Sequence, residues 1–236
     1  EVQERTIVNI TGTSGNDTIS GGVNNDTISG GAGNDSLSGL GGADSILDGS
    51  GQDDITAGAG ADEVTLSSNS ERDNINQEAS DGVAASATGF QGAAFAVGDT
   101  IPFGNGVDVV NNFLAGASAG ADQLAIGTTV STSLLGGATG ARTIGWLSGN
   151  YDSVTHVFTV TANGSGSDTL VLKGSDLSAG TSRAVLLVGV DSDQLVDSNF
   201  AGTDINIVPL YDPSTAAFTF QAGSAASNRL YMQTAS

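Results

Sequence analysis

A nine-residue alternation of polar and apolar positions runs without a gap from Gly12 to Thr65. Each unit opens with a glycine-rich stretch, has aspartate at its sixth position and carries one aliphatic residue at its eighth, between mostly Ser and Thr neighbours. Because successive side chains of a strand point to opposite faces, this pattern predicts a turn and then a three-residue strand with its middle side chain inward. The inward residues are Ile19, Ile28, Leu37, Ile46, Ile55 and Val64.

The aspartates of the repeat are expected to stack. Two units complete one coil, so alternate aspartates lie on the same side at about the 4.8 Å strand spacing. Carboxylates this close repel one another by about 1 kcal/mol even in water. Residues 6–71 contain neither Lys nor Arg, so a cation from outside the protein is expected between the turns. The aspartates are Asp17, Asp26, Asp35, Asp44, Asp53 and Asp62.

The six tandem units, GTSGNDTIS, GGVNNDTIS, GGAGNDSLS, GLGGADSIL, DGSGQDDIT and AGAGADEVT, resemble the calcium-binding repeats of the RTX family and cover about a quarter of the chain. The resemblance implies a parallel β-roll with calcium held between turns on the same side by Asp side chains and turn carbonyls. Calcium takes six to eight oxygen ligands, and two gaps per side predict roughly four ions or more. The implied carbonyl ligands are those of Gly12, Ser14, Gly21, Val23, Gly30, Ala32, Gly39, Gly41, Asp48 and Ser50.

Some residues within the repeat depart from its pattern, and four aspartates outside it have the same spacing to an aliphatic residue. Thr13 and Leu40 stand at glycine positions, where we expect them to distort the turns beside Asp17 and Asp44. Four further aspartates precede an aliphatic residue by two positions and are additional candidate calcium ligands, although a turn-capping role is the more common one for a single copy. They are Asp73, Asp108, Asp122 and Asp168.

The remaining chain predicts an all-β protein, in which the parallel β-roll is followed by a β-rich C-terminal region, either a sandwich or an extended roll. The predicted segments are 1–11 before the roll, 12–65 in it, 66–100 as a cap or connection, and 101–236 beyond. Short apolar runs between turns support this prediction; they are 107–110, 123–126, 143–147, 154–160, 169–172, 184–190, 205–210 and 216–220. Val154, His156, Phe158 and Val160 are expected on one strand face, with Trp146, Tyr151 and Phe158 in the core.

Charge and composition narrow the function. The formal net charge is −20 with six basic residues, which excludes nucleic-acid binding and disfavours anionic membranes. There is no cysteine for disulfides and no apolar run near the roughly 18 residues of a membrane span. Without calcium the acidic, glycine-rich repeat is expected to be expanded. The RTX resemblance implies type I secretion to the cell exterior, with an export signal in the tail from about residue 197.

Catalysis is not expected. Residues 116–120, GASAG, match a hydrolase nucleophile elbow, and Asp152 and His156 follow in the order of a triad. An elbow needs a strand before it and a helix after it, whereas residues 121–126 predict a strand. Chance explains the match better in a chain with 35 glycines. His156 is expected to have a structural role, because a zinc site would need partners that this cysteine-free chain lacks.

The sequence therefore favours a secreted, calcium-binding structural protein that assembles with copies of itself at a bacterial cell surface as a surface layer, matrix or fibre. A cell-surface polysaccharide or anchor is a further candidate partner. The alternative hypothesis is the C-terminal secretion and folding module of a larger exported hydrolase, toxin or adhesin. A standalone carbohydrate or cell-surface adhesin is the third, supported only by scattered aromatic residues.

Overall fold

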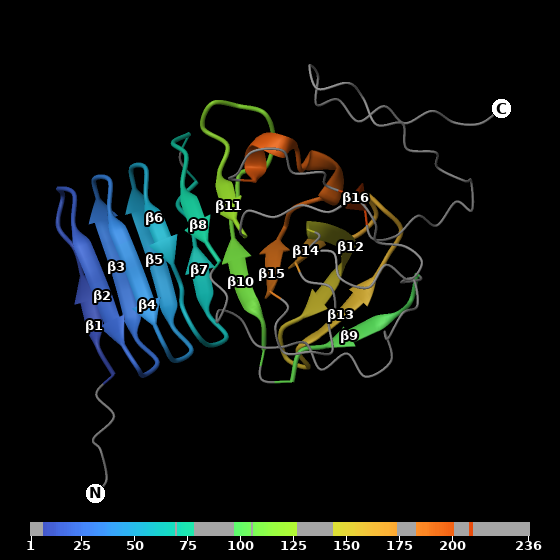
Figure 1. The fold of residues 1–236 in the computed structure, drawn as a ribbon, viewed down its shortest axis with the longest axis horizontal. Helices are drawn as coiled ribbons and strands as arrows, with labels where there is room; N and C mark the ends of the chain where they lie inside the picture. The colour runs from blue at the N-terminus through green and yellow to red at the C-terminus, as the bar shows by residue number, and fades with distance from the viewer. Residues whose placement is uncertain are drawn as a thin grey trace, which may run out of the picture.

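The computed structural model describes residues 7–68, 70–77, 97–104, 106–126, 144–173, 183–200 and 208–209 of the 236. In these segments the protein is built almost wholly from β-strands, which confirms the all-β prediction. The strands form one 11-stranded and one 5-stranded sheet (Figure 1). No helix in the described segments is long and apolar enough to cross a membrane.

The nonapeptides form a parallel β-roll, as predicted. Successive strands alternate between the two sheets, and every pairing within the roll is parallel. In the 11-stranded sheet the roll strands are β1 (Asn9–Thr11), β3 (Thr27–Ala32), β5 (Ser45–Ser50) and β7 (Glu63–Thr65). In the 5-stranded sheet they are β2 (Thr18–Gly22), β4 (Ser36–Leu40) and β6 (Asp54–Thr56).

The inward aliphatic residues form the core of the roll. Ile19 pairs with Leu37 and Leu37 with Ile55 along one sheet, while Ile28 pairs with Ile46 and Ile46 with Val64 along the other. All six are at least 93% buried in one apolar cluster. The nine-residue period therefore places one aliphatic layer per half-coil, and stacking of these layers supplies the hydrophobic stabilisation of a coil too thin to fold alone.

The roll continues past the repeat. Three strands outside the nonapeptides extend its sheets in parallel: β8 (Asn74–Asn76), β10 (Asp108–Asn111) and β11 (Gln123–Ala125). The predicted boundary at residue 65 is thus a boundary of the repeat register and not of the sheets. The segment 66–100, expected to cap or connect, contributes a strand of the roll through β8.

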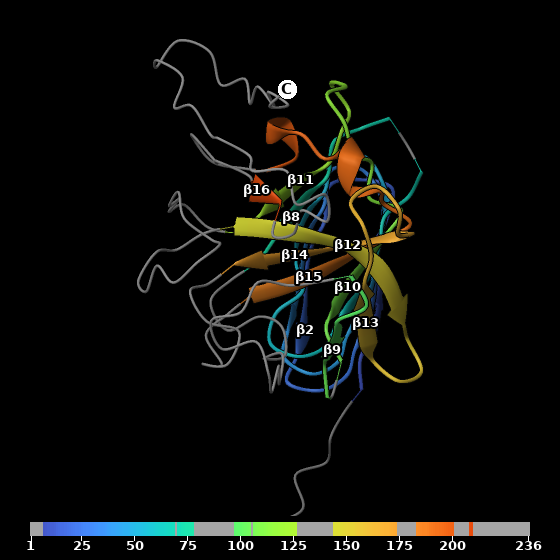
Figure 2. The ribbon, with the colours of Figure 1, turned by 90° about the vertical axis from the view of Figure 1, so that its right-hand side faces the viewer.

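Beyond β10 the larger sheet becomes an antiparallel lobe. Its order is β15 (Arg183–Val188), β14 (Asp168–Lys173), β12 (Ile144–Asp152), β13 (Val157–Val160) and β9 (Thr100–Pro102), with β16 (Val208–Pro209) beside β12. Figure 2 views the molecule from the lobe end. A second apolar cluster, including Phe103, Leu147 and Phe158, lies within the lobe. The C-terminal region therefore continues both roll sheets through β10 and β11, as in the predicted extended roll, and adds an antiparallel lobe to the larger sheet.

Several predicted details of the lobe need correction. Val154 is 88% exposed and lies with His156 in the turn between β12 and β13, so the strand face begins only at Val157. His156 takes a left-handed φ of 53°, which ends the turn and prevents strand geometry there. Phe158 is buried as predicted, whereas Trp146 and Tyr151 are partly buried. The run 216–220 and most of the predicted export signal lie outside the described residues.

Leu40 carries the backbone strain that its place in the repeat predicts. It has a φ of 73° and is 52% exposed, while the glycines at the same repeat position, Gly31, Gly49 and Gly58, have φ between 101° and 109°. A left-handed conformation costs a residue with a Cβ roughly 1–2 kcal/mol.

Leu40→Gly is therefore expected to stabilise the protein by about 1 kcal/mol, because little apolar burial is lost with the exposed side chain. Denaturant unfolding in saturating calcium measures the change. A lower midpoint for the variant would show that the Leu40 side chain stabilises the turn more than its backbone strains it.

Candidate metal centre

The repeat aspartates are joined into two ladders, one at each edge of the roll. In the first ladder the carboxylate oxygen Oδ1 of each aspartate accepts the backbone N–H of the aspartate one coil earlier. The N···O distances are 2.8 Å for Asp17 to Asp35, 2.7 Å for Asp35 to Asp53, 2.9 Å for Asp53 to Asp73 and 3.0 Å for Asp73 to Asp122. The predicted stacking of alternate aspartates is therefore present.

The second ladder follows the opposite edge with the same bond. The N–H of Val8 donates to Asp26 at 2.7 Å, and Asp26 donates to Asp44 at 2.7 Å. Asp44 then donates to Asp62 at 2.8 Å, and Asp62 to Asp108 at 3.1 Å. Both ladders thus recruit aspartates from outside the nonapeptides, at sequence separations of up to 49 residues.

The second carboxylate oxygen, Oδ2, is left without a donor at the middle of the ladders. Asp35, Asp44, Asp53 and Asp73 are at most 3% exposed, and their Oδ2 atoms have no hydrogen-bond partner within the described part of the chain. A buried, unsatisfied carboxylate oxygen is costly unless a cation neutralises it. These atoms therefore fit the oxygen-rich shell that calcium requires.

Glycine holds the first position of the first four repeats, and the close approach of neighbouring atoms explains why. A Cβ on Gly30 would lie 2.6 Å from Oδ2 of Asp35 and would clash with the carbonyl oxygen of Asp48. A Cβ on Gly39 would clash in the same way with Oδ2 of Asp44 and the carbonyl oxygen of Ala57. The glycines thus keep open a space lined by one carboxylate and one carbonyl oxygen, as the hard-cation prediction requires.

Burial and mutual repulsion raise the pKa of several of these carboxyl groups. Burial is the main cause of the raised pKa of Asp44 and of Asp53, and the charge of the neighbouring ladder aspartate adds to it. Burial also raises the pKa of Asp122, against the lowering effect of two backbone N–H donors and Arg72. At the open end, the backbone and side-chain donors of Thr13 lower the pKa of Asp17. The interior of the ladders is therefore the part that most needs a counter-ion.

The four candidate calcium ligands outside the nonapeptides differ in how many carboxylate oxygens already accept a hydrogen bond. Both oxygens of Asp108 accept N–H donors, from Asp62 and from the Gln77 amide, and both oxygens of Asp122 accept backbone N–H groups. Asp168 lies in the lobe and accepts the N–H groups of Tyr151 and Gly189. Among the four, only Asp73 combines a ladder bond with a buried oxygen that lacks a hydrogen-bond donor. Calcium binding by these four stays a prediction.

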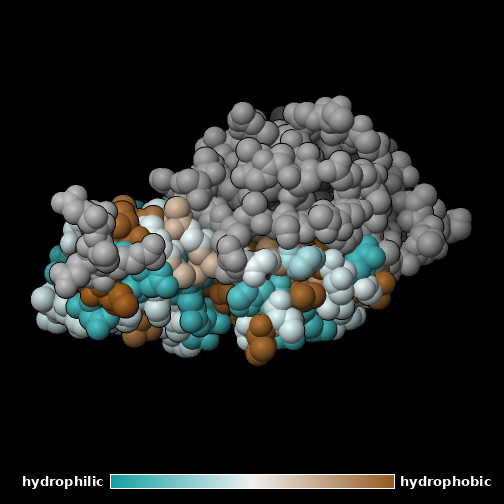
Figure 3. All heavy atoms as spheres, turned by 90° about the horizontal axis from the view of Figure 1, so that it is seen from below, coloured by the Kyte–Doolittle hydropathy of each residue, from teal (hydrophilic) through white to brown (hydrophobic). Residues whose placement is uncertain are grey.

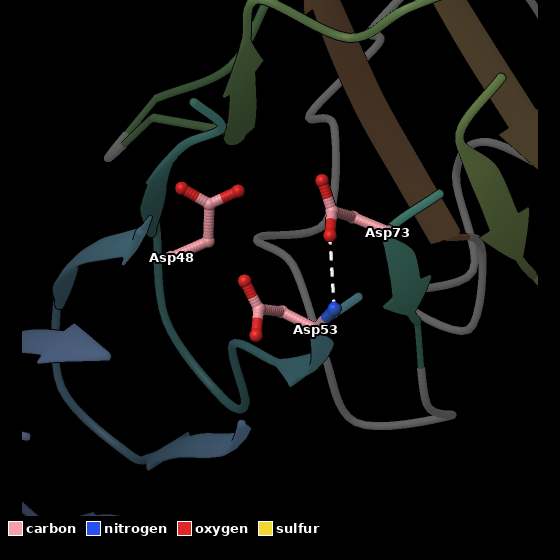
Figure 4. A group of neighbouring side chains, drawn as sticks. All are labelled: Asp48, Asp53 and Asp73. Atoms are coloured by element: carbon pink, nitrogen blue, oxygen red, sulfur yellow. Dashed lines mark hydrogen bonds between the residues drawn. The ribbon is translucent and has the colours of Figure 1, made fainter. Parts of the chain in front are cut away.

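Asp48 contributes a side chain that sequence reasoning missed. It was expected to offer only its backbone carbonyl, but its side chain is fully buried and lies with those of Asp53 and Asp73 (Figure 4). One carboxylate oxygen from each residue falls within 4.8 Å of the other two. Burial raises the pKa of Asp48 to about 6 and that of Asp73 to about 7, with the neighbouring aspartates adding to both shifts. The aspartate at a repeat position normally held by glycine was the available signal.

A ladder of amide side chains on the turns was also missed. The side-chain carbonyl of Asn16 accepts the N–H of Asn34, and that of Asn34 accepts the N–H of Gln52. On the other edge, Asn25 accepts the N–H of Ala43. These residues share the fifth repeat position, directly before the aspartate, so their recurrence at nine-residue spacing was the signal. They join successive turns on the outside of the roll.

The predicted carbonyl ligands are only partly placed by these contacts. The carbonyl oxygens of Gly30, Gly39 and Asp48 lie beside the open spaces, and that of Ala57, which was not predicted, joins them. The carbonyl of Ser50 accepts the N–H of Gly33 at 2.8 Å. Calcium binding stays a prediction for all the carbonyl ligands, and these contacts do not place six of them: Gly12, Ser14, Gly21, Val23, Ala32 and Gly41.

The residues of the hydrolase-like pattern serve as loop and turn elements. Residues 116–120 lie in the loop between β10 and β11, which leads into a strand and not into a helix. Oδ1 of Asp152 accepts the N–H groups of Val154 and Thr155, and the Val154 bond is the first cause of its lowered pKa. Nδ1 of His156 lies 3.3 Å from the carbonyl oxygen of Gly104.

Comparison with known proteins identifies the repeat. A model of the RTX calcium-binding nonapeptide repeat matches residues 9–37 and 29–64. No curated protein matches the sequence. Two solved structures show similarity, the AlgE6R3 and AlgE6R2 subunits of the mannuronan C5-epimerase of Azotobacter vinelandii. The first is 19% identical, with 92% of this chain and 94% of that chain covered at a TM-score of 0.30. The second is 22% identical, with 85% and 94% covered at a TM-score of 0.26.

The matched residues include the six repeat aspartates of the two ladders. The nine-residue register, the inward aliphatic stack and the paired aspartates all lie within the matched segment or continue directly from it. Residues 9–64 are therefore RTX calcium-binding nonapeptide repeats, folded as a parallel β-roll.

Proposed function

We propose that this is an exported structural protein whose β-roll becomes ordered when it binds calcium outside the cell. The buried Oδ2 atoms of Asp35, Asp44, Asp53 and Asp73, each without a hydrogen-bond donor, carry this proposal. A net charge of −20 adds self-repulsion that bound cations relieve. Metal binding and folding are then one process, because the sites exist only in the coiled chain.

Export follows from the level of calcium that such sites need. Sites built from carboxylates and carbonyl groups in extracellular modules bind at about 0.1–1 mM, a level absent from a resting cytosol. The chain would remain expanded and acidic inside the cell and would fold outside. Type I secretion is the proposed route, in keeping with the lack of cysteine.

The open end of the roll supports self-association as the finer proposal. The strands β1 and β2 are each paired on one side only in the described structure, so they present sheet edges at the N-terminal end of the roll. At the opposite end of the 5-stranded sheet, the outer edge of β11 is covered. Leu124 forms a parallel β-bridge with Phe200, and the Gln123 side-chain amide donates a hydrogen bond to the carbonyl oxygen of Ser198. A second copy would therefore add at the β1 and β2 end.

The exposed surface fits association through strand edges. The described part of the face shown in Figure 3 is a mixture of hydrophilic and neutral residues with scattered hydrophobic ones. Pairing of backbone groups at the β1 and β2 edges needs no broad apolar patch. Assembly in a layer, matrix or fibre, and attachment to a cell-surface polysaccharide, stay proposals on this basis.

A second function is favoured by the same open end. Oδ1 of Asp35 accepts from Asp17, and a preceding coil would place its own aspartate N–H beside Asp17 in the same way. The roll could therefore be continued by further repeats of a longer exported protein, for which this chain would be the folding and secretion module. An adhesin or enzyme would then lie elsewhere in that protein.

A calcium titration of the purified chain tests both functions, followed by circular dichroism, size-exclusion light scattering and electron microscopy, with magnesium as the control. We expect gain of β-structure and compaction with calcium and little response to magnesium, because magnesium demands stricter octahedral geometry. Particles larger than a monomer in calcium would support self-association. A folded monomer at all concentrations would favour the module, and no response to calcium would contradict the proposed function.

A further inference from the structure

Asp48 departs from the repeat pattern, because it places a carboxylate side chain where the first four nonapeptides have glycine. It occupies the first position of the fifth nonapeptide, where Gly12 and Gly30 stand at the same edge of the roll. Asp48 is fully buried at the inner face of β5, next to the last nonapeptide turn of the first ladder. The following turn on this edge is irregular, because the ladder spacing changes from 18 to 20 residues between Asp53 and Asp73.

Three carboxylates converge at this junction. Asp48 comes from β5, Asp53 from the turn before β6 and Asp73 from the turn before β8 (Figure 4). Their Oδ2 atoms are buried and lack a hydrogen-bond donor within the described segments. Ligand oxygens about 2.3–2.6 Å from one calcium ion lie at most about 5 Å apart. The 4.8 Å limit on the three carboxylate oxygens therefore fits one shared ion.

The other oxygens of the cluster are already fixed by backbone donors. Oδ1 of Asp48 accepts the N–H groups of Gly49 at 2.5 Å and Ser67 at 2.8 Å. Oδ1 of Asp53 and Oδ1 of Asp73 accept the ladder bonds from Asp35 and Asp53. Each carboxylate is thus fixed through one oxygen and keeps a buried second oxygen without a hydrogen-bond donor in the described segments. Such preorganisation lowers the cost of binding a cation.

Arg72, which precedes Asp73 in the sequence, directs its guanidinium to other acceptors. The guanidinium of Arg72 donates to the carbonyl oxygens of Ala121 at 3.1 Å and Ala119 at 3.2 Å. Its charge only partly opposes the burial that raises the pKa of Asp122, whose two oxygens both accept backbone N–H groups. Asp48, Asp53 and Asp73 therefore form an acidic group with no cation within the described part of the site.

We propose that Asp48, Asp53 and Asp73 form a three-carboxylate site for one calcium ion, separate in composition from the two-aspartate sites of the regular repeat. The inference rests on the proposed function, since it assigns one calcium site of the same roll. Its additional carboxylate makes it the tightest site, because affinity in such sites rises with the number of charged ligands. The ion would join the repeat to the irregular coil that begins at residue 66.

The test compares Asp48→Asn with Asp54→Asn by isothermal titration with calcium and by native mass spectrometry of the full chain. Asp48→Asn keeps an oxygen for the Gly49 and Ser67 donors but removes the charge. Asp54 is exposed on β6, so its variant makes the same charge change close by without altering the cluster. We expect Asp48→Asn to weaken the tightest calcium site at least tenfold or to lose one ion, with Asp54→Asn like the wild type.

Equal calcium stoichiometry and affinities for the two variants would overturn the three-carboxylate site. Asp48→Gly gives the same test if Asp48→Asn fails to fold, because glycine stands at this position in the two preceding turns of the edge. Failure of the wild-type chain to bind calcium would instead contradict the proposed function. A wild type that folds with calcium, beside variants that match one another, would contradict this inference alone.

Discussion

Gly30→Ala is expected to destabilise the calcium-bound protein by about 3 kcal/mol, at the upper end for an overpacked site. The added methyl group would clash with the carbonyl oxygen of Asp48 and lie 2.6 Å from Oδ2 of Asp35. The Asp48 carbonyl belongs to β5, which pairs with the strand of Gly30, so it cannot move without disturbing this strand pairing. The same methyl group would fill the oxygen-lined space, so calcium affinity should fall with stability. Denaturant unfolding at several calcium concentrations measures both effects.

Gly15→Ala is the matched control for this substitution. Gly15 also belongs to a nonapeptide, but a Cβ there would meet only the Thr13 hydroxyl, at 4.0 Å. Its φ lies outside the left-handed range. The control should therefore change stability by no more than about 0.5 kcal/mol. Similar losses for the two variants would show that the close approach at Gly30 is not what requires glycine.

Without calcium, the protein is expected to become less folded as the pH rises from about 5 to about 8. Burial, with repulsion from nearby aspartates, raises the pKa of Asp48 to about 6 and that of Asp73 to about 7 in the folded state. Their unfolded values are close to 3.8. The folded state therefore binds more protons than the unfolded state in this range, and its stability falls as pH rises through both values.

Calcium should reverse this dependence, because it binds the charged carboxylates and competes with protons. The stabilisation by calcium should consequently be large at pH 8 and much smaller at pH 5. Circular dichroism and denaturant unfolding, with calcium and with a chelator, measure the two profiles. With the chelator present, Asp73→Asn should weaken the dependence of stability on pH, because the substitution removes one of the two titrating carboxyl groups. A calcium-free stability that rises with pH would show that these carboxyl groups are not buried together.

In the C-terminal region, the local sequence pattern predicted where strands lie but not how they pair. Apolar runs near residues 107, 123, 143, 169 and 184 each predicted a strand, and β10, β11, β12, β14 and β15 lie there. Local pattern did not reveal that β10 and β11 are parallel strands of the roll while β12 and β14 are antiparallel. Strand direction depends on where the connecting segments lead, and those segments carry no repeat.

The candidate metal centre was also only partly predictable from the sequence. Six aspartates and the glycines around them recur every nine residues, so coil geometry alone indicated which carboxylates stack. Asp48 broke the register at a glycine position and was expected to contribute only its carbonyl. Its burial beside Asp53 and Asp73 depends on the irregular turn that follows, which supplies Ser67 as a donor.

The sequence by itself determined the turns, the inward aliphatic stack and the rows of aspartates along the two edges of the roll. Each of these follows from the nine-residue repeat, which is half of one coil. The tertiary structure alone decided that Asp73, Asp108 and Asp122 continue the ladders, at separations of 20, 46 and 49 residues. It also decided which carboxylate oxygens find an N–H donor and which stay open. Contacts across long, non-repeating connections leave no periodic trace in a sequence, since only the packed sheets set the positions of their ends.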